Sequence, residues 1–210
     1  MTTLVEFDRE CSQAGALLVA GVDEAGRGAW AGPVVAAAVI LPPDWVPDGL
    51  DDSKRLDPLA RERIAGELRQ RALAWAACAV SAREIDDVNV LRATLRAMAR
   101  SVGRLRPVPD LVLVDGLQVP EIACEARALI KGDGTSACIA AASILAKVLR
   151  DRVMTAWDRR HPLYGFATHK GYGASRHRLA LRAHGPCPLH RRSYRPVAEV
   201  AQTELWNDSC

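Results

Sequence analysis

The stretch Leu17–Leu41, LLVAGVDEAGRGAWAGPVVAAAVIL, places two apolar runs on either side of a glycine-rich turn. Residues 17–22 and 34–41 are short, apolar and bounded by turn-forming residues, which is typical of buried strands. Residues 26–32 connect them, and their glycines supply the backbone conformations that a tight connection needs. The stretch therefore predicts two buried strands, and an acidic pair stands directly after the first.

The rest of the chain alternates between short apolar runs and stretches with helical spacing. Asp57 and Pro58 suit the N-cap and first position of a helix, which we expect to reach about Arg71. Apolar spacing indicates a second helix over residues 90–105, and an Ala-rich third is expected over residues 136–157. Further strands are expected at residues 73–81, 111–114 and 126–130, and residues 161–196 are expected to form loop and short helix. This alternation predicts an α/β fold with a mixed sheet.

Composition places the chain among soluble globular proteins. Of 210 residues, 49% are hydrophobic and 25% charged, which argues against a disordered or coiled-coil chain. The longest apolar run, residues 34–41, is far shorter than the ~20 residues that span a bilayer. Residues 1–12 lack the apolar core of a secretory signal. The six cysteines are scattered without a CxxC pair, so we expect reduced thiols in a cytoplasmic protein.

Four acidic residues stand at or near the ends of predicted strands. They are Asp23, Glu24, Asp115 and Asp133. Sites in open α/β sheets gather at strand ends, and converging carboxylates repel each other unless a cation lies between them. Oxygen ligands suit Mg²⁺ and Mn²⁺, and a pair of such ions can activate water and stabilise a leaving oxygen on phosphorus. The pattern predicts a two-metal hydrolytic site.

A series of short motifs extends from Ala20 to Val197, nearly the whole chain. In chain order they are GVDEAGRG at 21–28, AGPVVAAAV at 31–39, DSK at 52–54, VDG at 114–116, KGD at 131–133, AAASILAK at 140–147 with Arg150 and Asp151, YGF at 164–166, HKGY at 169–172 and HRRSY at 190–194. In this order they resemble the signature of bacterial type 2 ribonucleases H, the ribonuclease HII family.

The resemblance implies a ribonuclease H-like mixed sheet flanked by helices, with a helical C-terminal extension. We expect a catalytic core over residues 1–157 and a basic extension over residues 158–210 that helps to bind nucleic acid, as one compact unit. The implied reaction is hydrolysis of the RNA strand in RNA–DNA hybrids and cleavage 5′ of single ribonucleotides embedded in duplex DNA. Cleavage would leave a 3′-hydroxyl and a 5′-phosphate.

By position, the motifs also imply roles for individual residues. Asp23, Glu24, Asp115 and Asp133 match the family's metal-binding carboxylates, with Mn²⁺ or Mg²⁺ as cofactor and two ions expected in the catalytic complex. Asn or Gln in their place would leave the metal charge under-compensated.

Other matched residues suit contact with the substrate. The turn Gly26-Arg27-Gly28 lets the backbone approach closely, so its polar groups can bond a 2′-hydroxyl. Tyr172 resembles the family tyrosine that stacks beside the sugar at the junction. Ser53 and Lys54 suit a phosphate, through a hydroxyl and a point charge.

The turn departs from the family pattern in one respect. Ala29 and Trp30 stand where the family usually has a proline and a small aliphatic residue, so we expect a looser turn around a bulky ring. A dinucleotide-binding loop is disfavoured, because the spacing is GxGxxxG and two acids precede the first glycine.

Two further groups of residues are kept out of the predicted site. His184, Cys187 and His190 could suggest zinc, but no fourth ligand is evident nearby, so we interpret them as a surface loop. Asp151, flanked by arginines, is interpreted as a paired surface charge.

The net charge of +3 conceals an uneven distribution. Between Arg150 and Arg195 eleven basic residues accompany two acidic ones, and all five histidines lie there, whereas the remainder holds 17 basic and 23 acidic residues. This basic segment suits a phosphate backbone.

Together these features predict a monomeric, cytoplasmic endonuclease that acts on RNA–DNA hybrids and ribonucleotide-containing duplexes, without membrane association. One alternative is a non-catalytic relative of the same fold, which retention of all four carboxylates disfavours. Another is a different nuclease or strand-transfer enzyme of this fold, which the Lys170-Gly171-Tyr172 motif disfavours.

Overall fold

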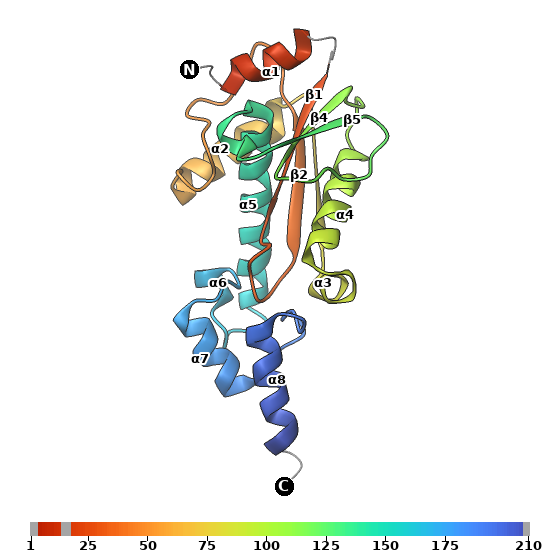
Figure 1. The fold of residues 1–210 in the computed structure, drawn as a ribbon. Coiled ribbons are helices and arrows are strands. Elements are labelled where there is room, and N and C mark those ends of the chain that lie inside the picture. The colour runs from red at the N-terminus through yellow and green to blue at the C-terminus, as the bar shows by residue number, and fades with distance from the viewer. Residues whose placement is uncertain (1–3, 14–17, 208–210) are drawn as a thin grey trace.

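The computed structural model describes residues 4–13 and 18–207 and builds them around a five-stranded sheet (Figure 1). Its strands lie in the order β3-β2-β1-β4-β5. β1 is antiparallel to β2 and parallel to β4, β2 is antiparallel to β3, and β4 is parallel to β5. The bounds are β1 Val19–Ala25, β2 Val34–Ile40, β3 Ala74–Val80, β4 Leu111–Asp115 and β5 Glu125–Leu129. The predicted mixed α/β sheet is confirmed.

Eight α-helices and a short 3-10 helix are described around the sheet. They are α1 (Leu4–Gln13), α2 (Pro58–Arg71), α3 (Ala82–Val88), α4 (Val90–Val102), the 3-10 helix η1 (Gly132–Gly134), α5 (Ala137–Asp158), α6 (Phe166–His169), α7 (Ser175–His184) and α8 (Arg195–Asn207).

The predicted helices appear as α2, α4 and α5; α1 and α3 were not predicted. Leu17, the expected start of the first strand, lies outside the described residues. The expected end of that strand at residue 22 is wrong, because pairing with β2 continues to Ala25.

Side-chain caps fix the starts of the two helices that pack closest to the site. The Asp57 carboxylate accepts hydrogen bonds from the backbone N–H groups of Leu59 and Ala60, as predicted for an N-cap. Ser136 accepts from the N–H of Ile139 and starts α5 in the same way. Each cap satisfies backbone donors that no turn of the helix can reach.

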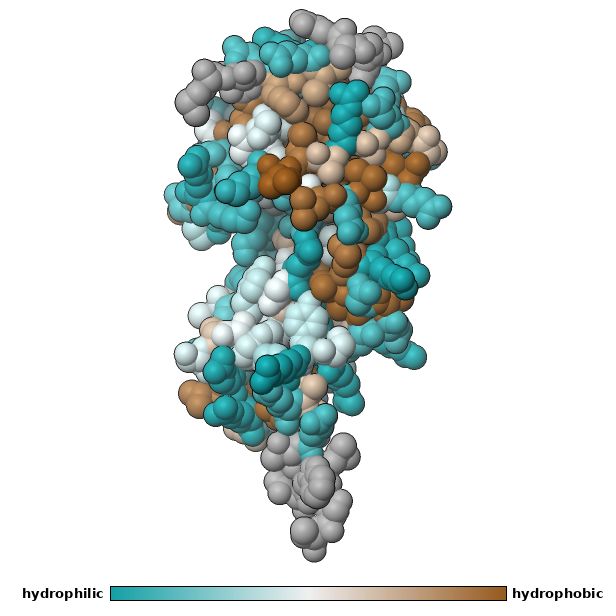
Figure 2. All heavy atoms as spheres, in the orientation of Figure 1, coloured by the Kyte–Doolittle hydropathy of each residue, from teal (hydrophilic) through white to brown (hydrophobic). Residues whose placement is uncertain are grey.

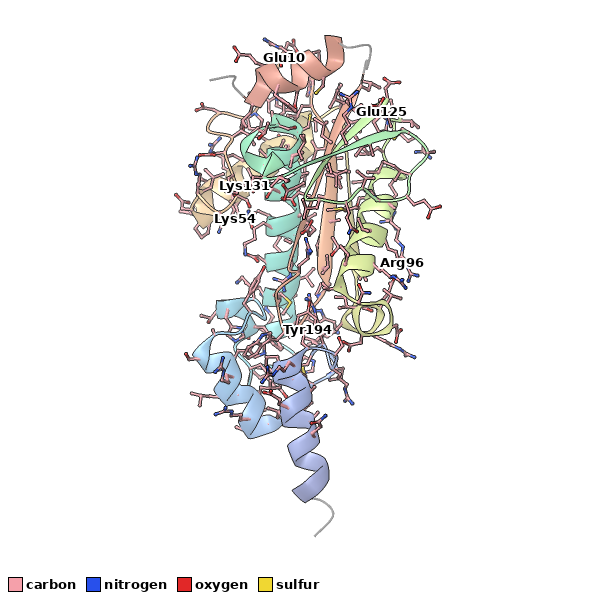
Figure 3. All side chains as sticks on the ribbon, in the orientation of Figure 1. Glu10, Lys54, Arg96, Glu125, Lys131 and Tyr194 are labelled. Carbon is pink, nitrogen blue, oxygen red and sulfur yellow. The ribbon has the colours of Figure 1, made fainter. Side chains whose placement is uncertain are left out.

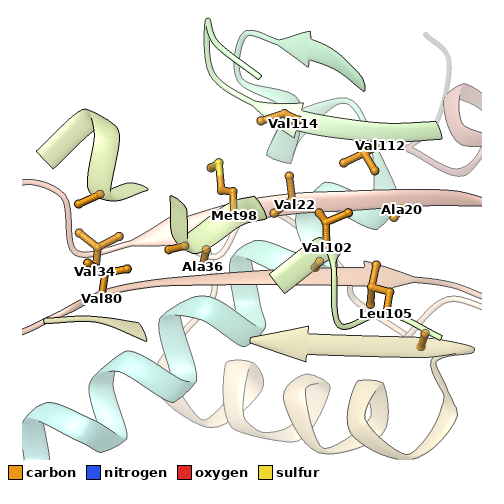
Figure 4. Packing of buried hydrophobic residues seen from close by; sticks show 14 of the residues in the cluster. Ala20, Val22, Val34, Ala36, Val80, Met98, Val102, Leu105, Val112 and Val114 are labelled. Atoms are coloured by element: carbon orange, nitrogen blue, oxygen red, sulfur yellow. The ribbon is translucent and has the colours of Figure 1, made fainter. Parts of the chain in front are cut away.

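Helices cover both faces of the sheet, so the central strands are apolar throughout. On β2, Ala36 and Ala38 point towards α4, whereas Ala37 and Val39 point towards α5. Figure 4 shows the first face, where Met98 and Val102 of α4 pack over the strands. All seven residues of β2 are buried, which explains its continuous apolar run.

The same alternation sets the direction of the acidic side chain on β1. Gly21 lies so close to α5 that an added Cβ would stand 2.1 Å from the backbone carbonyl carbon of Cys138. Asp23 follows by two residues and therefore shares the face of the sheet that α5 covers. The small residue thus lets the helix approach the strand that carries the first acid.

The C-terminal helices α6–α8 pack at the C-terminal end of α5, at the opposite end of the molecule from α1 (Figure 1). On the face shown in Figure 2, hydrophobic side chains gather over the half that holds the sheet, and the C-terminal half is mostly hydrophilic. Within residues 4–13 and 18–207, no helix combines the length and the apolar character needed to cross a membrane.

Buried histidines form the centre of this C-terminal unit. The Cys187 N–H donates to Nδ1 of His190, so Nε2 of His190 carries the proton and donates to Nε2 of His177 at 3.0 Å. His177 in turn donates from Nδ1 to the Tyr172 carbonyl at 2.9 Å. The interpretation of residues 184–190 as a surface loop is wrong for Cys187 and His190, because both are buried in this chain of bonds.

The cysteines agree with the expectation of reduced thiols as far as they are described. Cys11, Cys78, Cys124, Cys138 and Cys187 are free, and Cys210 lies outside the described residues.

Substituting Gly21→Ala tests the close approach of β1 and α5. We expect the free energy of unfolding to fall by about 1–3 kcal/mol, because the added methyl group overpacks against helix backbone. Urea denaturation measures the change. The matched control is Gly66→Ala in α2, where a Cβ meets nothing within 4 Å and stability should hold or rise slightly. Equal effects of the two substitutions would contradict the close packing.

The histidine chain predicts a loss of stability in mild acid. Burial lowers the pKa of both His177 and His190 from 6.5 to about 4. Between those values the unfolded chain binds more protons than the folded one, so stability is complete above about pH 6.5 and declines towards pH 4. The slope is at most about 1.4 kcal/mol per pH unit for each histidine.

Urea denaturation at several pH values checks this slope. His190→Gln should flatten the decline between pH 6.5 and 5, whereas His184→Gln, at an exposed position, should leave it as in the parent protein. The same slope in all three proteins would refute the role of the buried pair.

Candidate active site

The parallel pairing of the two central strands brings the acidic residues together. Val22 of β1 lies opposite Val114 of β4, so Asp23 and Asp115 come next on neighbouring strands. Asp115 is the last residue of β4, and Asp133 lies in η1 directly after β5. The carboxylate of Asp115 accepts the Gly132 N–H at 2.7 Å, which ties η1 to the end of β4.

Asp23 and Asp115 line a cleft of about 370 Å³. Its lining combines predicted site residues with others; it comprises Asp23, Glu24, Ala25, Gly26, Ser53, Lys54, Arg61, Asp115, Ser143, Lys147 and Tyr172. The structure therefore brings together most of the predicted site. Arg27 and Gly28 are exposed beside the cleft, and Asp133 reaches it through Lys54.

Three carboxyl groups in the cleft hold negative charge at an energetic cost. Burial, followed by the charges of Glu24 and Asp115, raises the pKa of Asp23 well above its usual range. Burial also raises the pKa of Glu24 and of Asp115, although the Arg27 guanidinium opposes the rise at Glu24. Carboxyl groups in this state gain stability when a cation enters between them.

Lys54 supplies one such cation from the DSK loop. Its ammonium donates to Oδ2 of Asp133 at 2.9 Å, and this bond raises the pKa of Lys54. Figure 3 labels Lys54 on this flank of the molecule. The predicted phosphate contact by Lys54 stays a prediction, since the described partner is a carboxylate.

Residues of α2 and α5 anchor the loop that carries Lys54. Ser53 is buried, and its hydroxyl lies 2.9 Å from that of Ser143 on α5. Arg61 of α2 donates to the carbonyls of Ser53 and Leu56. Ser53 therefore acts here as an anchor, and its predicted phosphate contact remains untested.

The donor set fits a hard divalent cation. Asp23, Glu24 and Asp115 offer only carboxylate oxygens, and burial with mutual repulsion leaves their charge under-compensated. Among residues 4–13 and 18–207, no three His, Cys, Asp or Glu side chains are already gathered as a metal cluster. These carboxylates can supply oxygens to a bound cation, and Lys54 balances the charge of Asp133.

The glycine turn lies at the edge of the cleft and is firmly held. Gly26 has φ +97°, a conformation that favours glycine, and an added Cβ would lie 1.9 Å from Nε of Arg150. Trp30 donates its backbone N–H to the Gly171 carbonyl at 2.8 Å, and its ring packs against Gly173. Trp30 thus joins the turn to the loop of Tyr172, and the looser turn expected from Ala29 and Trp30 is not what the structure shows.

Tyr172 faces the cleft from that loop. Its side chain is partly exposed, and the Arg150 guanidinium carbon lies 5.0 Å from the ring centroid. Lys147 lies on the same ring at 5.8 Å. The ring is thus available for stacking at the mouth of the cleft.

Two arginines in the basic segment are not available to nucleic acid. Arg150 and Arg191 are fully buried, so counting them towards a phosphate-binding surface is wrong. The sequence held a signal for one of them: Ala142, Ala146, Arg150 and Met154 recur every four residues on the buried face of α5. Asp151, as interpreted, is paired, with Lys147 at 2.9 Å.

A second hollow continues from the cleft between α2, α5 and α6. It measures about 660 Å³ and shares Arg61 and Lys147 with the cleft. Its basic residues are Arg61, Lys147, Arg152, Arg159 and Lys170, against the acidic Glu62 and Asp151. We call this hollow the basic groove.

Comparison with known proteins shows the family of the chain. The family described as Ribonuclease HII matches residues 20–197 of the chain. Ribonuclease HII of Geobacillus kaustophilus (strain HTA426) is 53% identical over 197 residues, which cover 94% of this chain and 75% of that protein. Ribonuclease HII of Syntrophotalea carbinolica is 50% identical over 193 residues, which cover 92% of each chain.

Solved structures agree in fold. The crystal structure of ribonuclease H2 from Pyrococcus horikoshii OT3 has a TM-score of 0.75 at 26% identity, covering 89% of this chain and 98% of that one. Bst-RNase HIII in complex with Mn²⁺ has a TM-score of 0.70 at 20% identity, covering 91% and 71%, and shares the fold. With its acidic cleft, matched residues and sheet, the chain belongs to the ribonuclease HII family.

Proposed function

We propose that this cleft cleaves on the 5′ side of single ribonucleotides embedded in duplex DNA, leaving a 3′-hydroxyl and a 5′-phosphate. As a ribonuclease HII, the protein is a metal-dependent endoribonuclease that cleaves RNA in RNA–DNA hybrids. One observation carries the finer proposal: Asp23, Glu24 and Asp115 share a single cleft with Gly26 and Tyr172. The residues proposed to bind metal and the residues proposed to contact the sugar thus line the same cleft.

We assign the four carboxylates to two divalent cations, Mg²⁺ or Mn²⁺. When bound, such ions lower the pKa of a water and neutralise the departing 3′-oxygen. Asp23 and Asp115 present oxygens from adjacent strands, Glu24 adds one beside Arg27, and Asp133 adds one from η1. The paired strands fix the backbone positions of Asp23, Glu24 and Asp115 before the substrate arrives, which lowers the cost of organising the site.

The sugar-reading groups lie beside these carboxylates. The carbonyls of Gly26 and Arg27 accept bonds from Arg191, whereas the N–H groups of Arg27 and Gly28 have no partner within the described chain. Those N–H groups are free to bond a 2′-hydroxyl, which a deoxyribose lacks. The Tyr172 ring suits stacking on the following deoxyribose.

The duplex around the scissile bond needs positive charge, and the basic groove supplies it. Arg159 and Lys170 lie along the groove, and Lys147 links it to the catalytic cleft. We assign residues 158–210 to this binding role, joined to a catalytic core of residues 1–157 as one compact unit. We infer that the protein acts as a monomer in the cytoplasm.

The test is a duplex with one embedded ribonucleotide, incubated with Asp115→Asn and with the parent protein. The parent should cut 5′ of the ribonucleotide with Mg²⁺ or Mn²⁺ and not in excess chelator. Asp115→Asn should lose about a thousandfold or more in rate, because an anionic ligand is removed. Its unfolding free energy should hold or rise, since a carboxyl with a raised pKa is replaced.

The control is Asp110→Asn, whose carboxylate accepts the Leu18 N–H away from the cleft and whose rate should match the parent. Parent-like turnover by Asp115→Asn would remove Asp115 from the metal site. Cutting of an all-DNA duplex at the same rate would refute the proposed substrate.

Tyr172→Ala tests the stacking role. We expect cleavage at the embedded ribonucleotide to fall about tenfold or more, since stacking on a nucleic acid is worth roughly 1–3 kcal/mol. Tyr172→Phe keeps the ring and should retain most of the rate. If Tyr172→Ala cleaves as fast as the parent, the ring serves packing alone.

A further inference from the structure

Two buried arginines hold the glycine turn from behind. Arg191 donates from Nη2 to the Gly26 carbonyl at 2.7 Å and from Nη1 to the Arg27 carbonyl at 2.8 Å. Its Nε and Nη2 both reach the Gly32 carbonyl, at 3.1 and 2.9 Å. All three guanidinium nitrogens therefore bond to backbone oxygens of the same turn.

Arg150 completes the hold from α5. Its Nε donates to the Pro33 carbonyl at 3.0 Å, and Nη2 reaches the carbonyls of Ala31 at 3.3 Å and Lys170 at 2.9 Å. The last bond crosses to the loop of Tyr172, and the guanidinium also lies beneath the Tyr172 ring. Arg150 thus connects the turn with the stacking residue.

Burying the two guanidinium groups costs folding free energy. Neither arginine has an ion pair within residues 4–13 and 18–207, and burial lowers the pKa of both. The charge of Arg191 also lowers the pKa of Arg150. Nη1 of Arg150 is buried with no hydrogen-bond partner. Buried cations without an ion pair disfavour folding, and such departures concentrate at functional sites.

Tyr194 extends the network to the turn's outer side. Its hydroxyl accepts from Nη1 of Arg191 at 3.0 Å and donates to the Arg27 carbonyl. Figure 3 labels Tyr194 where the C-terminal helices meet the sheet. The Gly26 and Arg27 carbonyls are thereby bonded from within the protein, and among the described residues the N–H groups of Arg27 and Gly28 have no partner.

We propose that Arg150 and Arg191 are positioning residues. They hold the Gly26–Gly28 turn and Tyr172 in the relative positions that contact with the ribonucleotide requires. The planar guanidinium group of arginine suits this role, because its N–H donors can bond several carbonyls at fixed angles. Lysine keeps the charge and loses the planar group. The inference rests on the proposed function of the turn and adds the residues that set its geometry.

Arg191→Lys tests the proposal in two measurements, with Arg92→Lys as the matched control on the exposed face of α4. The first is single-turnover cleavage of the embedded-ribonucleotide duplex at saturating enzyme, together with the KM. We expect the rate to fall about tenfold or more with KM changed less than about twofold, because a misplaced turn costs orientation more than binding. Arg92→Lys should match the parent.

The second measurement does not depend on cleavage. In protein labelled with ¹⁵N-glycine, the amide signals of Gly26 and Gly28 should shift or broaden in Arg191→Lys, while those of Gly66 and Gly103 stay in place. Arg150→Lys should shift the signals of Gly171 and Gly173 as well, since its bonds reach that loop. Measurement well below the melting temperature separates local change from unfolding.

The outcomes distinguish a failure of the proposed function from a failure of the positioning role. If the parent does not cut at the embedded ribonucleotide, the proposed function fails, while the glycine signals still decide whether the arginines hold the turn. A parent-like rate with unchanged glycine signals in Arg191→Lys overturns the positioning role. Shifted signals with an unchanged rate also overturn it, because the turn's geometry would then not matter to the reaction.

Discussion

Repulsion between buried carboxylates is the constraint around which this molecule is organised. Asp23 stands on the central strand of the sheet, and its charge is opposed by both Glu24 and Asp115. Such a cluster disfavours folding unless rigid neighbours force it together. Those neighbours are the parallel β1–β4 pairing and the close packing of α5 at Gly21, where the lack of a Cβ lets helix and strand meet. The fold thus holds negative charge ready for cations.

Much of this could be predicted from sequence because the signals were local or periodic. The apolar runs of β1 and β2 and the Asp57–Pro58 start of α2 were visible as patterns. The four acids were identified through their positions in motifs. Helix α3 was missed because it is only seven residues long, with Ser81 as its cap.

Other features depend on contacts between distant segments, which no local pattern shows. Arg191 meets Gly26 across 165 positions of sequence, and Lys54 meets Asp133 across 79. A basic residue in a basic segment indicates a phosphate surface, yet Arg191 is buried. Likewise, His184, Cys187 and His190 suggested a loop from spacing alone, whereas His190 bonds His177 inside the C-terminal unit. The charge of the segment therefore did not predict which of its basic residues are exposed and which are buried.

The choice between lysine and arginine follows the mobility that each position needs. Lys54 is 76% exposed on a flexible stem, and its point charge can leave Asp133 when another cation takes its place. Arg150 and Arg191 are buried and bond several carbonyls each, so neither can move without releasing the turn. Under the proposed function, exchangeable positive charge therefore lies beside the carboxylates assigned to the cations, and fixed positive charge lies behind the turn and the ring assigned to the sugar. This division lets the cation site adjust while the recognition surface stays rigid.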